Sequence, residues 1–211
     1  MRLRRVIVLV VAEALLLIAT AGMAAAQGTG ATAELKDAKG KDVGSAQFTE
    51  DPQGVAITAQ VKGLDPGEHG IHIHEKGDCS SSDFESAGKH FNPGSTKHGL
   101  ENPEGPHAGD LPDITVNEDG TGAYQATTDR VTLSSGKTSL FDSDGSALVI
   151  HQKTDDQKTD PAGNSGSRVA CGEIKQAKLP ASGGVNVPLV TLLGVAGLGV
   201  GIILWRRLSH S

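Results

Sequence analysis

The chain has 211 residues, 37% of them hydrophobic and 21% charged, and its formal net charge is −6. This acidic balance argues against a nucleic-acid-binding protein, because such proteins neutralise phosphates with clustered lysine and arginine. The same net charge would repel an anionic substrate unless a local positive group overrides the global field.

Residues 1–26 have the order of a secretory signal peptide. Three arginines precede an apolar run, and that run ends at three consecutive alanines. We expect cleavage after Ala26, although Glu13 interrupts the apolar run, and a retained membrane anchor is the alternative. Loss of this segment removes three arginines and one glutamate, which leaves a net charge of −8 on the rest of the chain.

Residues 28–68 are predicted to form β-strands. Over residues 55–62, valine, isoleucine and alanine alternate strictly with less hydrophobic residues, and a period of two is typical of a half-buried strand. Turn signals at residues 39–41, 51–54 and 64–67 recur at strand spacing. This part of the chain therefore reads as three consecutive strands.

The remainder of the domain, to residue 177, also lacks amphipathic helices and internal repeats. Two long loops without helical periodicity, residues 77–112 and 155–167, are expected to be functional. About eight short strands separated by turn signals favour an all-β, Greek-key antiparallel sandwich or barrel over residues 27–177. Further strands are expected at residues 69–75, 114–116, 123–127, 147–151 and 168–175, with the second and third forming a hairpin.

The C-terminal segment has the features of a surface anchor. Residues 178–184 form a linker that contains the sequence LPASG, and residues 185–205 form an apolar run. About 20 apolar residues suffice to cross a bilayer as a helix. Arginines open the tail, residues 206–211, and would remain on the cytoplasmic side. We therefore expect residues 27–177 to lie outside the cytoplasmic membrane.

Six of the eight histidines fall between residues 69 and 110, in a segment rich in glycine and proline. His72 and His74 are two positions apart on a predicted strand, so both imidazoles project from one face. Neighbouring imidazoles on a rigid element suit a transition metal, although a single His-x-His pair also occurs by chance on polar strand faces.

A second group of candidate ligands lies in one loop and consists of His90, His98, His107 and Asp110. Three imidazoles and one carboxylate form the donor set of a structural zinc site, and a solvated polar loop is the alternative. His151 ends an apolar strand and becomes a further candidate ligand beside the others. Asp155 follows it by four positions and could accept hydrogen bonds from ligand imidazoles.

The chain contains two cysteines, Cys79 and Cys171. In an exported domain they most simply form one disulfide. This bond would close a loop of about 90 residues and, on the chain-entropy model, stabilise the fold by roughly 4–5 kcal/mol.

Taken together, the motifs resemble those of the copper,zinc superoxide dismutases of the bacterial exported type. The resemblance covers about residues 30–175, and its motifs occur in the family's order and at family-like separations. They are GIHIHE (70–75), GDC (77–79), SAGKHFNP (86–93), KHG (97–99), HAGDL (107–111), VIH (149–151) and GNSGSRVACG (163–172).

The resemblance implies a copper ion, a structural zinc ion and superoxide as the substrate. Superoxide would be converted to oxygen and hydrogen peroxide by alternate reduction and oxidation of the copper. His90 would be a bridging imidazolate shared by both metals, and Arg168 would lie above the copper as the second catalytic residue. The implied copper ligands are His72, His74, His90 and His151, and the implied zinc ligands are His90, His98, His107 and Asp110. The resemblance also makes Asp155 the carboxylate that links the two metal sites, and Cys79–Cys171 the family's disulfide.

The loop at residues 155–167 departs from the animal members, because it is short and lacks their acidic pair and lysines. Its only cation is Lys158, and Lys89 beside His90 is another candidate for steering the substrate. A non-catalytic zinc- or copper-binding surface protein of the same fold is the main alternative function. An adhesion or cell-wall structural module is a second alternative, and the sequence makes no prediction of oligomeric state.

The C-terminal segment resembles a sortase sorting signal of Gram-positive bacteria. The motif LPASG carries Ser182 where threonine is usual, and a plain transmembrane helix is the alternative. Both interpretations predict an exported protein at the cell surface, anchored to the membrane or to the cell wall.

Overall fold

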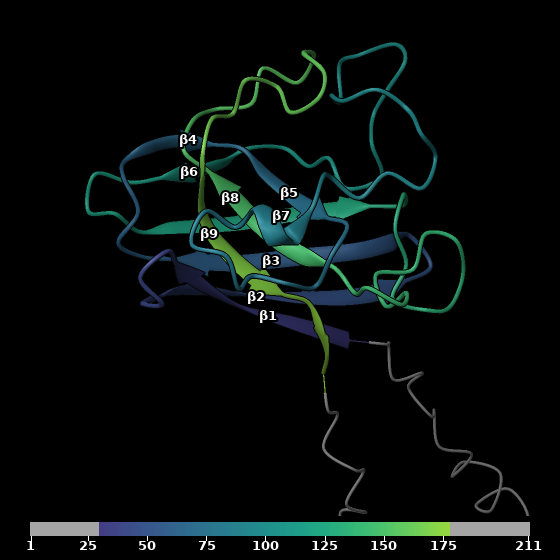
Figure 1. Ribbon diagram of the computed structural model, residues 1–211, viewed down its shortest axis with the longest axis horizontal. Helices are drawn as coiled ribbons and strands as arrows, with labels where there is room; N and C mark the ends of the chain where they lie inside the picture. Colours follow the sequence, from purple (N-terminus) through teal and green to yellow (C-terminus); the bar gives the residue numbers. More distant parts are fainter. Residues whose placement is uncertain (1–29, 178–211) are drawn as a thin grey trace, which may run out of the picture. The chain divides into compact units, whose positions relative to one another are not determined.

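The computed structural model describes residues 30–177, which form ten β-strands and one short 3₁₀ helix, η1 (Figure 1). The expected signal peptide and the C-terminal linker, apolar run and basic tail lie outside these residues. The first strands are β1 (Gly30–Asp37), β2 (Asp42–Asp51), β3 (Gly54–Val61), β4 (Gly67–His69) and β5 (Ile71–His74), followed by η1 (Glu85–Ala87). The others are β6 (Ile114–Val116), β7 (Gly122–Thr128), β8 (Ala147–His151), β9 (Arg168–Glu173) and β10 (Lys175–Gln176).

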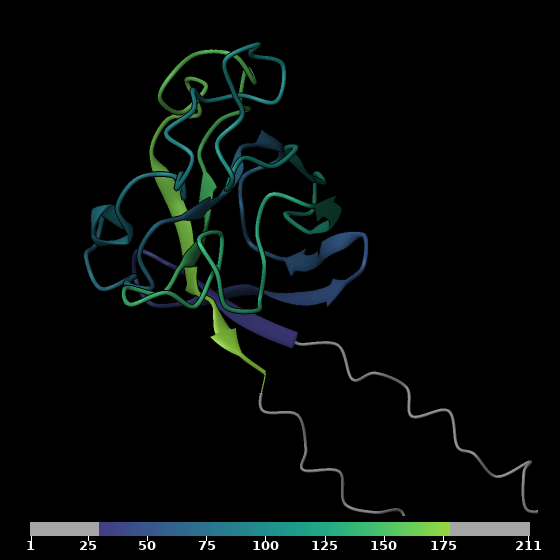
Figure 2. The same ribbon diagram turned by 90° about the vertical axis from the view of Figure 1, so that its right-hand side faces the viewer.

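The main sheet has the strand order β5-β8-β9-β1-β2-β3-β7, and β10 pairs with β1. Every pairing between named strands is antiparallel, and β4 and β6 form a separate two-stranded sheet. The predicted all-β antiparallel fold is therefore confirmed, and the sheet curls around its core (Figure 2). Within residues 30–177 no helix has the length and apolarity needed to cross a bilayer.

The core follows from the period of two in the strands. Phe48 of β2 faces Ile57 of β3 in the ladder, and both side chains are at most 1% exposed. Leu35 of β1 and Leu148 of β8 are completely buried in the same core. Each such side chain contributes roughly 1.5–3 kcal/mol when fully buried. This rigid sheet is the support on which the histidine-bearing strand β5 and its neighbour β8 are held.

The strand β8 is buried along its whole length, because both of its faces are covered. Leu148 and Ile150 enter the main core, whereas Val149 packs against Phe84 in a smaller cluster. The loop that carries Phe84 is tied to β9 by the disulfide Cys79–Cys171, as expected from the sequence. The disulfide thus fixes the loop that passes over β8.

Two strand expectations need correction. The strand expected at residues 69–75 is divided at Gly70, so that β4 pairs with β6 and β5 pairs with β8. The expected hairpin, in which β6 would pair with β7, is wrong. Instead β6 pairs with β4, and β7 pairs with β3. A Cβ at Gly122 would lie 2.8 Å from the Thr115 carbonyl oxygen, so glycine is required where the chain changes sheet.

Parts of the long loops at residues 75–113 and 152–167, coloured teal and green, lie side by side at the top of both views (Figures 1 and 2). The backbone N–H of Glu101 donates to the Gln157 carbonyl at 3.0 Å, and that of His98 donates to the Asp160 carboxylate at 2.9 Å. Each loop therefore supports the other above the strands that carry His72, His74 and His151.

Candidate metal centre

Four histidines converge where β5 and β8 meet the first long loop. His72 and His74 leave the same face of β5, and His151 ends the neighbouring strand β8. His90 reaches them from the loop, because it forms an antiparallel bridge with His74. All four are at most 5% exposed, and their ligand atoms lie within 4.8 Å of one another.

One nitrogen of each strand histidine is held by a neighbouring oxygen. His74 Nδ1 lies 3.1 Å from the Gly88 carbonyl oxygen, and His151 Nδ1 lies 3.2 Å from that of Gly166. The free Nε2 atoms of these two rings approach each other to 3.4 Å. Their Nε2 atoms are thus the ones available to a metal.

Two buried ring nitrogens that face this cluster have no hydrogen-bond partner, namely His72 Nδ1 and His90 Nε2. A buried polar atom without a partner costs free energy, so both positions fit metal donors. Burial, reinforced by His90, lowers the pKa of His72 to about 3, and burial lowers that of His151 to about 4. Both imidazoles are therefore neutral at pH 7, as a metal ligand must be.

The second donor set gathers around one carboxylate oxygen, Oδ1 of Asp110. The Nδ1 atoms of His90, His98 and His107 lie 2.9, 3.1 and 3.3 Å from it. The other oxygen, Oδ2, accepts hydrogen bonds from the backbone N–H groups of Gly99 and His107, at 2.8 and 2.9 Å. Three imidazole nitrogens and one carboxylate oxygen match the donors of a structural zinc site.

His72 also has a ligand atom within 4.8 Å of those of His90, His98 and Asp110. His107 fits this set better than His72, because His72 Nε2 already contacts Asp155 at 2.7 Å. The buried Nδ1 of His107 has no hydrogen-bond partner, which fits a donor. The structure thus brings together every ligand that the sequence predicted.

The carboxylate of Asp155 joins the two sets. Its Oδ2 lies 2.7 Å from His72 Nε2, and its Oδ1 lies 3.0 Å from His98 Nε2. Burial alone would raise the pKa of Asp155, but the hydrogen bonds to His72 and His98 hold it well below its ordinary value. Asp155 therefore remains ionised and fixes the orientation of one ring in each set.

His98 and Asp110 are electrostatically coupled in the metal-free protein. Burial opposes protonation of His98, but hydrogen bonds to Asp110 and Asp155 raise its pKa to about 9. Burial likewise opposes ionisation of Asp110, but the close imidazoles of His107, His90 and His98 hold its pKa far below the usual range. A metal at this set would therefore displace a proton from His98.

The sixth histidine of the segment, His69, is not part of either set. Its ring nitrogens each lie 2.8 Å from a backbone carbonyl oxygen, those of His151 and Asp65. Because both ring nitrogens of His69 already contact backbone oxygens, neither is available to a metal.

Arg168 lies beside the four-histidine cluster. It faces His151 in the β8–β9 ladder, and its Nη2 donates to the Gly88 carbonyl at 2.7 Å. The same carbonyl oxygen holds His74 Nδ1, so one backbone group connects the arginine to a predicted copper ligand. Nη1 donates to the Phe84 carbonyl, which fixes the guanidinium in place.

Three supporting residues were not anticipated from the sequence. Asp113 accepts a hydrogen bond from the Asp155 backbone N–H at 3.1 Å, and Arg130 Nη2 donates to the Asp110 carbonyl at 2.6 Å. Gly163 has a φ of 59°, and a Cβ there would lie 1.7 Å from Asp155 Oδ1. Of these three residues, only Gly163 could have been found from the sequence, because it is the first residue of the GNSGSR motif.

The two predicted steering cations differ in their surroundings. Lys158 forms an ion pair with Glu101 at 2.7 Å, so its charge is largely offset. Lys89 is exposed and forms no ion pair with any residue from 30 to 177, and its backbone N–H donates to the Glu75 carboxylate at 3.1 Å. Of the two, Lys89 is the better candidate for a free positive charge.

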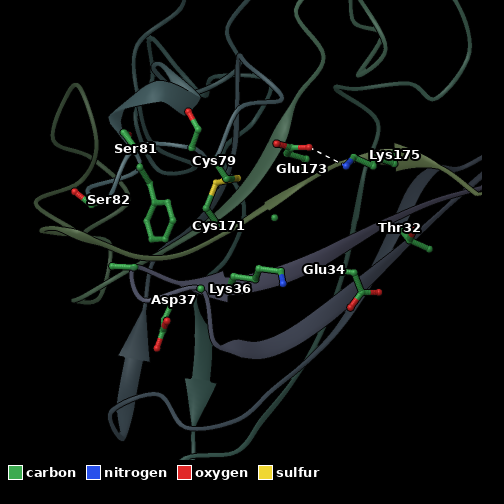
Figure 3. A pocket seen from close by; sticks show the side chains of 15 residues that line it. Thr32, Glu34, Lys36, Asp37, Cys79, Ser81, Ser82, Cys171, Glu173 and Lys175 are labelled. Atoms are coloured by element: carbon green, nitrogen blue, oxygen red, sulfur yellow. Dashed lines mark ion pairs between the residues drawn. A yellow bond between two sulfur atoms is a disulfide. The ribbon is translucent and has the colours of Figure 1, made fainter.

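A cavity of about 480 Å³ lies beside the disulfide (Figure 3). Its wall includes Cys79, Cys171 and the ion pair of Glu173 with Lys175, whose charged atoms are 2.9 Å apart. None of the predicted metal ligands lines it.

Comparison with known proteins gives matches across this domain. Residues 43–174 match the family model described as copper/zinc superoxide dismutase. The chain is 50% identical over 147 residues to Superoxide dismutase (Cu-Zn) 2 of Aquifex aeolicus, covering 69% of this chain and 86% of that protein. It is 47% identical over 148 residues to Superoxide dismutase (Cu-Zn) of Caulobacter vibrioides, covering 69% and 85%. The crystal structure of a SOD-like protein from Bacillus subtilis aligns with a TM-score of 0.65 at 43% identity, covering 67% and 95%.

Proposed function

The chain belongs to the copper/zinc superoxide dismutase family, and we propose that its two donor sets form one dinuclear site in which His90 serves both metals. The enzyme is an oxidoreductase that uses copper and zinc to convert two superoxide anions and two protons to oxygen and hydrogen peroxide. The observation that carries the proposed site is the orientation of His90. Its Nδ1 lies 2.9 Å from Asp110 Oδ1, whereas its buried Nε2, without a hydrogen-bond partner, faces the other three histidines.

Bound copper supplies one-electron redox chemistry, because it alternates between two oxidation states. The proposed copper ligands are His72 Nδ1 and the Nε2 atoms of His74, His90 and His151. The proposed zinc ligands are the Nδ1 atoms of His90, His98 and His107 with Asp110 Oδ1.

Each remaining residue of the site has a defined task in this proposal. Arg168 supplies the local positive charge that draws a small anion to an acidic protein. The ring of His90 can hold a proton at Nε2 when that atom is not a ligand, because Nδ1 keeps the ring in the other set. Asp155 prevents the rings of His72 and His98 from turning, so both donor atoms stay directed inward.

The function is tested by removal and return of each metal. Full-length protein should accelerate superoxide decay in stopped-flow measurements, lose that activity when copper is chelated, and recover it with copper but not with zinc. A copper- and zinc-replete protein that leaves the decay at its spontaneous rate would instead support the non-catalytic metal-binding alternative.

We further propose that the enzyme is exported and anchored at the cell surface, where it would meet superoxide formed outside the cell. The support is the sequence alone, namely the signal-like residues 1–26, the LPASG motif at 179–183 and the apolar run at 185–205. Cleavage by a sortase would fall between Ser182 and Gly183. Mass spectrometry of the C-terminal peptide tests this, since an intact tail at residues 185–211 would favour a membrane helix over wall linkage.

A further inference from the structure

Glu85 forms an ion pair with Arg168, the residue expected to attract the substrate. Its Oε2 lies 3.2 Å from Arg168 Nη2, and its side chain is 68% exposed while that of Arg168 is 12% exposed. The carboxylate therefore approaches the guanidinium from the solvent side, where an incoming anion would also arrive.

The loop holds Glu85 in this position through its neighbours. Phe84 adopts φ 59° and buries its ring against Ala87, Val149 and Cys171, so the short helix η1 starts at a fixed point. The disulfide fastens the same loop to β9, the strand that begins with Arg168. Glu85 thus faces the guanidinium because the backbone on both sides of the contact is anchored.

The contact places a negative charge beside one nitrogen of the guanidinium. Nη2 donates to the Gly88 carbonyl at 2.7 Å, and Glu85 Oε2 lies 3.2 Å from the same nitrogen as an ion pair. Nη1 already donates one N–H to the Phe84 carbonyl. The charge of Glu85 therefore stands beside the guanidinium that would attract the anion.

The charge of Arg168 is also offset by its surroundings. Asp83 lies on the same loop, and Arg168 contributes to a lowered pKa of its carboxyl group, whose main cause is a backbone hydrogen bond to Glu85. Lys158 is paired with Glu101 and Lys97 lies 3.6 Å from Asp160, whereas Lys89 forms no ion pair within residues 30–177. A negative loop residue thus stands beside Arg168, the arginine next to the four-histidine cluster.

We propose that Glu85 is a positioning residue that limits anion access to Arg168, so that the wild-type enzyme works below the rate its site could reach. This inference rests on the proposed function. Arg168 does not need Glu85 to stay in place, because the Phe84 and Gly88 carbonyls hold it. Neutralising Glu85 should therefore raise both anion affinity and rate, whereas a residue needed only for structure would lower them.

The test compares Glu85→Gln, which removes the charge, with Glu85→Ala, which also removes most of the side chain beside Nη2. Glu118→Gln on the β6–β7 turn is the matched control, because Glu118 is exposed and forms no ion pair with any other residue of the described domain. At low ionic strength we expect Glu85→Gln to raise the second-order rate constant by about threefold, and Glu85→Ala by at least as much. At about 1 M salt the Debye length is only about 3 Å, so the rate constants of the Glu85 variants should fall towards that of Glu118→Gln.

Azide titration of the copper-loaded proteins gives a readout that does not depend on turnover. Azide should bind about threefold more tightly to Glu85→Gln than to wild type or Glu118→Gln, with copper and zinc contents unchanged. Rates and azide affinities equal to or below wild type in both Glu85 variants would overturn the proposal. If the wild type showed no dismutation, the proposed function would fail, yet the azide affinities would still decide the role of Glu85.

Discussion

Asp155 Oδ2 lies 2.7 Å from His72 Nε2 in the four-histidine cluster. The other oxygen of the same carboxylate, Oδ1, lies 3.0 Å from His98 Nε2 in the second donor set. In the proposed site the two sets are therefore connected twice, by the ring of His90 and by one buried carboxylate. A displacement of Asp155 should weaken the binding of both metals. By contrast, loss of a ligand that belongs to only one set should weaken the binding of one metal first.

Gly163→Ala tests this connection without changing a ligand. The new Cβ would lie 1.7 Å from Asp155 Oδ1 and 2.8 Å from His98 Nε2, so the carboxylate must move. We expect both copper and zinc affinity to fall by about 10- to 100-fold, measured by competition with a chelator. Gly40→Ala is the control, since Gly40 also has positive φ, 77°, but a Cβ there would meet nothing within 4 Å. Equal metal retention in the two variants would show that Asp155 does not couple the sets.

His74→Ala and His107→Ala should separate the two metals. His74 lies only in the set proposed for copper, so its loss should abolish dismutation and copper binding while zinc remains. His107 lies only in the other set, so its loss should reduce zinc content first. Elemental analysis beside a superoxide assay measures both effects, and full activity in copper-replete His74→Ala protein would remove the copper assignment.

Arg168→Glu reverses the charge beside the copper set and should lower the rate by about tenfold to a hundredfold at low ionic strength. Arg168→Lys should lower it less, because lysine keeps the charge but loses the paired bonds to the Phe84 and Gly88 carbonyls. Metal content should be unchanged in both variants. Rates equal to wild type in stopped-flow measurements at low salt would contradict the steering role.

Cys171→Ser removes a bond between cysteines 92 positions apart. On the chain-entropy model the metal-free protein should lose roughly 4–5 kcal/mol of unfolding free energy, an upper value if the bond is strained. Urea denaturation measures the loss, and reduced wild type serves as the control because it should unfold like the variant. An unchanged midpoint, or two reactive thiols in protein recovered from outside the cell, would contradict a stabilising disulfide.

Local sequence patterns predicted the strands in which hydrophobic and less hydrophobic residues alternate. The strict period of two at residues 55–62 became β3, and the His-x-His pair became β5, with both imidazoles on one face as expected. The division of a strand at Gly70 and the sheet change at Gly122 were not predicted. Both depend on which distant strand is available for pairing, and local sequence patterns do not reveal that choice.

The candidate ligands, which the structure brings together, could be identified from the sequence because each motif carries them at a recognisable position. The contacts that support them could not, since they join residues far apart in the chain. Glu85 meets Arg168 across a sequence separation of 83, and Asp113 holds the backbone of Asp155 across 42. Such contacts depend on how two long loops pass each other, which only the folded structure reveals.

The central claim is that one ring, His90, belongs to both donor sets, and magnetic coupling tests it most directly. The full-length protein would be loaded with Cu(II) in both sites and examined by electron paramagnetic resonance. A bridging imidazolate should couple the two unpaired electrons antiferromagnetically, so the ordinary Cu(II) signal should be almost absent at low temperature and should reappear when one site is filled with zinc. Two additive, uncoupled Cu(II) signals in the doubly loaded protein would show that His90 serves one metal only.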